Sequence, residues 1–106
     1  MDIGKILEIV TDKWPCSANE YPGMKNLDPE SQKQLERVHT LLHVHKSAGK
    51  ISAHLEPVDH GNAGNPSAAK REIGKLLLDV MRLAVAFDLT AEELEQMIAA
   101  WEQQRS

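Results

Sequence analysis

Five histidines are the side chains of this sequence best suited to binding a metal ion, because imidazole is a common ligand of zinc and iron. His39 and His43 are four residues apart, so on a helix both lie on one face. No glutamate follows His39, and the HExxH pattern is absent. A third ligand would come from Asp59, His60 or Asp79. The spacing leaves two interpretations open: a zinc or iron site, and histidines that are only polar positions on a helix.

Three Gly-Lys pairs suggest a second chemistry, the binding of phosphate by a P-loop. The pairs are Gly4-Lys5, Gly49-Lys50 and Gly74-Lys75, and each is followed by isoleucine or leucine. A P-loop needs a serine or threonine there and a glycine five residues upstream, so this motif is excluded. The later two pairs share one short pattern inside predicted helices. Because glycine inside a helix costs about 1 kcal/mol relative to alanine, we predict that these two glycines face one another where helix backbones come close.

The segments around these two glycines resemble the MazG-like all-α nucleoside triphosphate pyrophosphohydrolases. Residues 71–79 (REIGKLLLD), with their continuation through residues 82–93, resemble the second half of that family. Residues 46–51 (KSAGKI) resemble its first Glu-Gly-Glu helix. The resemblance covers about residues 5–102. It implies an all-helical fold and a site where carboxylates from antiparallel helices hold Mg²⁺ ions, which bridge the phosphates and activate a water.

The family's metal site is a Glu-x-x-Glu on one helix and a Glu-x-x-Asp on the next. The matching positions here are Ser47, Lys50, Glu72 and Lys75, and the interval between the two motifs fits the family. Only Glu72 is a carboxylate. Lysine in place of a carboxylate opposes binding of a divalent cation, so the resemblance implies a degraded site without a cofactor. If Mg²⁺ does bind, Glu72 and Asp79 are the expected ligands.

Two roles for the lysines remain open besides a relocated metal site at the histidines. In the first, Lys50 and Lys75 pair with Glu72 and Asp79 across the helix interface and form a salt-bridged structural core. In the second, Lys46, Lys50 and Lys75 form a cationic pocket that binds a phosphate or a nucleotide, with ammonium groups in place of Mg²⁺.

Capping residues and helical periodicity predict the four helices that must position these side chains. The expected ranges are 3–14 after an Asp2 cap, 29–55 after Asp28, 66–87, and 91–102 after a Thr90–Glu93 capping box. Proline and glycine mark loops at residues 15–27 and 57–66. Strand signals are almost absent. We therefore expect an all-α, four-helix MazG-like bundle that occupies residues 1–106 as one domain.

Composition excludes several classes of protein. The chain has 106 residues, of which 42% are hydrophobic and 26% charged, so it is neither disordered nor a membrane protein. A net charge of -4 argues against nucleic acid as a partner. The single cysteine, Cys16, allows no internal disulfide and fits a reducing compartment. Asp2 and Glu8 do not suit a secretory signal, so we expect a cytoplasmic protein without membrane contact.

The breadth of the apolar surface in residues 68–87 predicts that part of it meets a second subunit in a homodimer. We expect a catalytically degraded relative that acts as a binding, regulatory or structural homodimer, and we assign no catalytic residues. One alternative is an active metal-dependent nucleoside triphosphate pyrophosphohydrolase. Another is a helical interaction module that presents its acidic last helix, residues 88–106, to a partner protein.

Overall fold

Four helices make up the fold in a computed structural model that describes residues 1–17 and 19–105. They are α1 (Ile3–Lys13), α2 (Pro29–Asp59), α3 (Pro66–Ala86) and α4 (Ala91–Gln104), with a short 3-10 helix, η1 (Pro22–Met24), between α1 and α2. These described residues contain no strand, and the all-α prediction is confirmed. None of the helices in the same ranges is long and apolar enough to cross a membrane.

Side-chain caps fix the helix starts where the sequence predicts them. The carboxylates of Asp2 and Asp28 each accept a hydrogen bond from the backbone N–H three residues later, at 2.8 Å. The Asn65 side chain does the same at the start of α3, and Thr90 and Glu93 form the expected capping box. Each cap satisfies a backbone donor that has no partner within the helix.

α2 continues to Asp59, one turn beyond the predicted end at Leu55, so that Pro57 lies inside its last turn. The prediction ended the helix before this proline because proline has no N–H to continue the ladder. The loop after the helix folds back, and the Asn65 N–H donates to the His54 carbonyl at 2.9 Å. That bond holds the last turn of α2 and also fixes where α3 begins.

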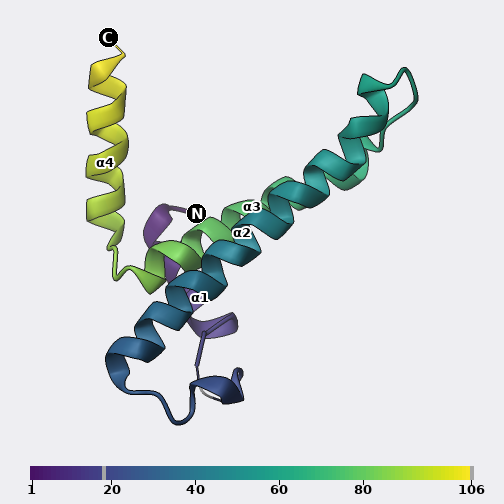
Figure 1. Cartoon of the computed structure of the whole chain (residues 1–106). Helices are drawn as coiled ribbons and strands as arrows, with labels where there is room; N and C mark the ends of the chain where they lie inside the picture. The colour runs from purple at the N-terminus through teal and green to yellow at the C-terminus, as the bar shows by residue number, and fades with distance from the viewer. Residues whose placement is uncertain (18, 106) are drawn as a thin grey trace.

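α2 and α3 form a long helical hairpin, and α1 packs against α3 (Figure 1). Small side chains allow α3 to approach its neighbours closely. The buried apolar residues are Val10, Met24, Ala68, Ala69, Ala84 and Ala86. Since alanine buries little area, this core is modest for a chain of this length.

α4 leaves the hairpin at a steep angle and contacts α1 (Figure 1). The turn before it has the hydrogen bonds of a Schellman motif, from the Leu89 N–H to the Ala84 carbonyl and from the Asp88 N–H to the Val85 carbonyl. Asp88 has φ 57, a left-handed conformation that glycine usually adopts at this position. Its carboxylate pairs with Lys33 at 2.8 Å, which ties the turn to α2.

The four helices do not form the predicted bundle within one copy, because α4 does not lie along the hairpin. The radius of gyration is 16.6 Å, whereas a compact domain of this length has about 13 Å. The principal extents of 51 × 40 × 23 Å describe the same elongated shape. Much of the apolar surface of α2, α3 and α4 is therefore left uncovered.

The two helical glycines do not face one another, which corrects the prediction made from their shared pattern. A Cβ atom at either Gly49 or Gly74 would meet no atom within 4 Å. On α2 the buried position is Ser47, and a residue two positions later points about 200° away from it. Gly49 is thus on the outer side of α2. Gly74 is likewise exposed, on the outer side of α3.

Candidate functional site: a buried aspartate between α2 and α3

Asp79 on α3 is the most deeply buried charged side chain of the described chain, with 0% of its surface exposed. One carboxylate oxygen accepts a hydrogen bond from the Ser47 hydroxyl of α2. The other oxygen accepts a bond from Lys75 Nζ at 2.7 Å. A buried carboxylate is costly unless it is neutralised and hydrogen-bonded, and both conditions are met here.

The ion pair forms within one helix and not across the interface. Lys75 lies one turn before Asp79 on α3, at the i, i+4 spacing that brings side chains together. About half of the Lys75 side chain is exposed, so its stem runs along the hairpin while its ammonium group reaches the carboxylate. Ser47 is the only one of the four metal-motif positions that makes a polar side-chain contact from α2 to α3 in the described chain.

Lys50 does not pair with Glu72, contrary to the salt-bridged core expected from the sequence. Lys50 is exposed on α2, and no described carboxylate lies within the 4.0 Å of an ion pair from its Nζ. Lys46 is exposed on the same helix and is likewise unpaired among the described residues. Glu72 is half-buried on α3. Of the three lysines predicted to form a cationic pocket, Lys75 is therefore paired with Asp79, and the other two face solvent.

The histidines do not assemble a metal site among the residues that the structure describes. His39 and His43 lie together as predicted, with ring centroids 4.6 Å apart, and Tyr21 packs on His39 at 4.2 Å. However, no group of three or more His, Cys, Asp or Glu side chains in residues 1–17 and 19–105 has a geometry that could hold a metal ion. His60 is at the far end of α2, paired with Glu56 at 3.7 Å.

Burial lowers the pKa of both clustered histidines below the usual value of about 6.5. For His39 the next causes are the neighbouring His43 and the guanidinium of Arg82. For His43, Arg82 is the second cause, and the Asp79 carboxylate acts in the opposite direction. Both rings are thus neutral at pH 7, and the positive charge beside Asp79 comes from Lys75.

Sequence reasoning did not identify Arg82 and Tyr21. Arg82 is 9% exposed, and its Nε donates to the Trp14 carbonyl at 3.2 Å, which joins the end of α1 to α3. The sequence feature that could have indicated a buried role for Arg82 is its position as the single charged residue in the apolar stretch 80–87. Tyr21 lies in a loop with no periodicity, so nothing in the sequence indicated that its ring would pack against His39.

Cys16 lines two small hollows of about 180 and 70 Å³, and Tyr21 and His39 also line the smaller one. Burial raises the pKa of its thiol, and the Glu36 carboxylate acts in the same direction. The thiol is therefore protonated at neutral pH, which disfavours nucleophilic chemistry.

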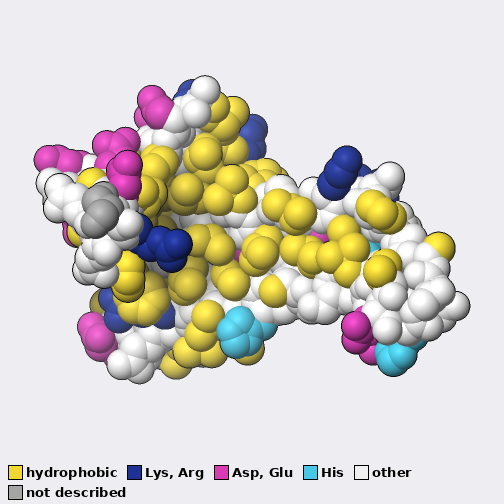
Figure 2. All heavy atoms as spheres, turned by 90° about the horizontal axis from the view of Figure 1, so that it is seen from above, with side chains coloured by type: hydrophobic (Ala, Val, Ile, Leu, Met, Phe, Trp, Pro, Cys, Tyr) yellow, Lys and Arg dark blue, Asp and Glu magenta, His cyan; other side chains and the backbone are white. Residues whose placement is uncertain are grey.

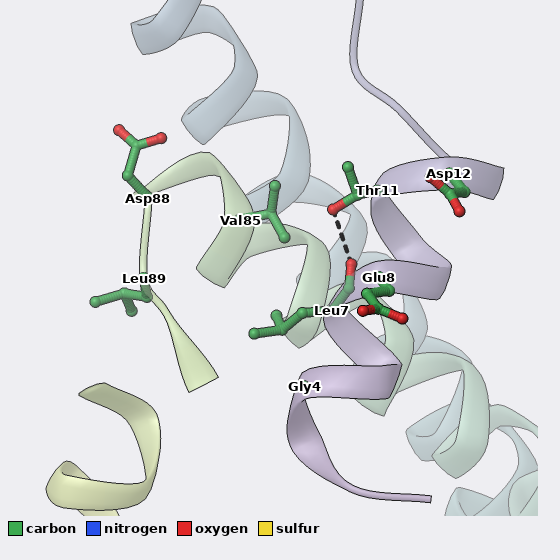
Figure 3. A pocket seen from close by; sticks show the side chains of 8 residues that line it. All are labelled: Gly4, Leu7, Glu8, Thr11, Asp12, Val85, Asp88 and Leu89. Carbon is green, nitrogen blue, oxygen red and sulfur yellow. Dashed lines mark hydrogen bonds between the residues drawn. The ribbon is translucent and has the colours of Figure 1, made fainter. Parts of the chain in front are cut away.

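A hollow of about 480 Å³ lies away from Asp79, between α1 and the turn that precedes α4 (Figure 3). Its lining residues are Gly4, Leu7, Glu8, Thr11, Asp12, Val85, Asp88 and Leu89. The Thr11 hydroxyl donates to the Leu7 carbonyl at 2.8 Å, and Asp88 is paired with Lys33. The lining therefore holds carboxylates and apolar side chains but no nucleophile paired with a base.

No protein-family model, curated protein or solved structure matches this chain. The chemistry assigned to the site therefore depends on the geometry of Asp79, Ser47 and Lys75.

Replacing Lys75 by alanine should destabilise the protein by about 1–3 kcal/mol, because a buried carboxylate then keeps only the Ser47 hydroxyl as a partner. Lys50→Ala is the matched control: it removes the same side chain from an exposed, unpaired position and should change stability by less than about 0.5 kcal/mol. Urea denaturation followed by circular dichroism measures both. Equal effects of the two substitutions would contradict the assigned pairing.

Stability should fall as the pH is lowered from 7 to 5.5. A histidine whose pKa is lowered by folding favours the neutral form in the native state, so its contribution is complete above about pH 6.5 and is lost as the pH drops further. Urea midpoints measured across this range should fall less in a chain with both His39→Gln and His43→Gln. His60→Gln, at the exposed end of α2, is the control that should keep the wild-type fall. An unchanged pH dependence in the double variant would exclude these two rings as its source.

Proposed function

We propose that this chain is a non-catalytic relative of the MazG-like nucleoside triphosphate pyrophosphohydrolases and acts as a homodimeric binding, regulatory or structural protein. The observation that carries the proposal is the 2.7 Å bond between Lys75 and the fully buried Asp79. Lys75 stands where the resemblance implies a metal-binding aspartate. A permanent ammonium group thus supplies the positive charge that Mg²⁺ supplies in the family.

Electrostatics opposes a metal ion at this place. Two unit charges of the same sign 4 Å apart repel by about 4 kcal/mol at an effective dielectric constant of 20, and a divalent ion doubles that figure. Both oxygens of the Asp79 carboxylate already accept hydrogen bonds, from Ser47 and Lys75. Glu72 would remain as a single carboxylate ligand, the lower end of the one or two that usually hold Mg²⁺ beside substrate phosphates.

Among the binding roles, recognition of a phosphate-bearing ligand without metal has a specific observation in its favour. Lys46 and Lys50 are exposed on one helix with no described carboxylate close enough to pair. Two unpaired ammonium groups one turn apart suit a phosphate or the phosphates of a nucleotide. Lys75 is left out of this proposal because its ammonium group is bound to Asp79.

Two other functions compete with this proposal. An active pyrophosphohydrolase would need Glu72 and Asp79 to hold Mg²⁺ with help from a second subunit. A helical interaction module without a ligand would present the acidic, projecting α4 to another protein. We place the protein in the cytoplasm, because the reducing conditions there keep a free thiol such as that of Cys16 reduced.

Pyrophosphate release from a panel of nucleoside triphosphates should not exceed the buffer rate with Mg²⁺, with Mn²⁺ or with a chelator, even at high protein concentration. The physical reason is that Lys75 occupies the position of the metal ion. Metal-dependent release that is proportional to protein, and is abolished by Glu72→Gln or Asp79→Asn, would overturn the proposal in favour of the hydrolase.

Thermal unfolding with inorganic pyrophosphate in chelator then separates binding from a structural role. Phosphate recognition raises the midpoint of the wild-type chain and not of the chain with both Lys46→Ala and Lys50→Ala. If pyrophosphate shifts the midpoint of neither chain, the structural role remains.

A further inference from the structure

One copy of this chain exposes far more surface than a compact protein of its mass. The accessible area is 7677 Å², whereas a folded monomer of 11.8 kDa exposes about 5,900 Å². The excess is about 1,800 Å² for each chain. Permanent homodimers bury about 2,000 to 5,000 Å² over both chains, so the excess area is enough for an interface of that class.

The uncovered apolar surface is concentrated on the face of the hairpin opposite α1. On α3, Arg82 and Val85 face α1 and the segment after it. A stripe of large apolar residues at helical spacing occupies another side of α3: Ile73, Leu77, Val80 and Phe87, each between 42% and 56% exposed. Figure 2, in which the hairpin is seen from above, shows hydrophobic side chains in a band along it to the base of α4.

A groove of about 390 Å³ lies between α2 and α3 on this face, lined by Arg37, Val38, Leu41, Leu83 and Phe87. The guanidinium of Arg37 sits over the Phe87 ring, 4.8 Å from its centroid, and its Nε donates to a backbone carbonyl of α3. Its other N–H groups have no partner among the described residues. The groove is thus an apolar depression with a fixed positive charge at one edge.

α4 carries an apolar stripe that its own chain leaves mostly uncovered. The stripe is Leu94, Met97, Ile98 and Trp101, at the i, i+3, i+4 and i+7 positions of one helix face. Trp101 is 68% exposed and Ile98 59%. The rest of the helix is acidic, with Glu92, Glu93 and Glu95 in its first half.

We propose that a second copy of this chain covers the hairpin face and that the apolar stripe of its α4, led by Trp101, enters the groove between α2 and α3. This inference deepens the proposed homodimer and rests on it. A helix of 14 residues is about 21 Å long, which is enough to cross the width of two packed helices. The stripe supplies an aromatic anchor, and the groove supplies the apolar pocket that such anchors occupy at protein interfaces.

Three observations favour a second copy over an unrelated protein. The stripe and the groove belong to the same chain, so a two-fold axis forms the contact twice and closes the assembly. The acidic side chains of α4 would meet Arg37 at the groove edge. The projecting α4 also acquires the packing that it lacks in one copy.

The mass of the chain in solution tests the interface. Light scattering after gel filtration should give twice 11.8 kDa for the wild-type chain. Trp101→Glu and Leu41→Glu each place a charge in the contact and should halve that mass. Gln96→Glu adds the same charge to the opposite side of α4 and should keep the dimer, as should Ala53→Glu on α2 away from the groove. Circular dichroism of the halved species reports whether the separated chain stays helical.

Disulfide trapping tests the seating of α4 by the proximity of two residues and does not depend on dissociating the dimer. In a Cys16→Ser background, chains with Trp101→Cys are mixed with chains with Leu41→Cys and oxidised. Mass spectrometry should find the disulfide that joins residue 101 of one chain to residue 41 of the other. Gln96→Cys in place of Trp101→Cys is the control that should not give this disulfide.

The outcomes separate this inference from the proposed function. A wild-type chain that is monomeric at micromolar concentration overturns both the homodimer and the interface. A dimer that keeps its mass with Trp101→Glu, or that gives no 41–101 disulfide, overturns the seating of α4 and leaves the homodimer standing. Catalytic turnover overturns the non-catalytic proposal without affecting either result on the interface.

Discussion

The burial of the Asp79 carboxylate between α2 and α3 is the constraint on which the rest of the structure depends. A carboxylate without contact to solvent needs hydrogen bonds and a compensating charge at fixed positions. Ser47 supplies the bond across the interface and thereby sets how α2 and α3 align. Lys75 supplies the charge from the same helix. Because α1 packs on one side of this hairpin, the alignment also determines which apolar residues are left on the other.

A lysine at this place has different consequences from a metal ion. Its charge is present whether or not a ligand is bound, so the hairpin does not need a cofactor to neutralise Asp79. An ammonium group is also no Lewis acid and cannot generate a bound hydroxide as a metal ion can. Lys75 therefore stabilises the buried carboxylate without supplying a Lewis acid, and this supports the proposed non-catalytic role.

The helix starts could be predicted from the sequence because each depends on local chemistry. Asp28 and the Thr90–Glu93 pair act on backbone groups within three residues, and the structure confirms both. The partner of Lys75 could not be predicted with the same ease, since a lysine reaches a carboxylate one turn away on its own helix as well as one on a neighbour. The direction of α4 depends on Asp88 in a left-handed conformation, for which a non-glycine residue gives no sequence signal.

The most direct test of the account is the stability of the native chain as a function of Mg²⁺ and Mn²⁺ concentration, with NaCl at equal ionic strength as the reference. A metal ion that binds only the folded chain raises its unfolding midpoint progressively as the free metal concentration exceeds the Kd. If Lys75 fills the place of the metal at Asp79, the midpoint stays at the NaCl value throughout. A midpoint that rises with either metal, and no longer does so in Asp79→Asn, would contradict the account.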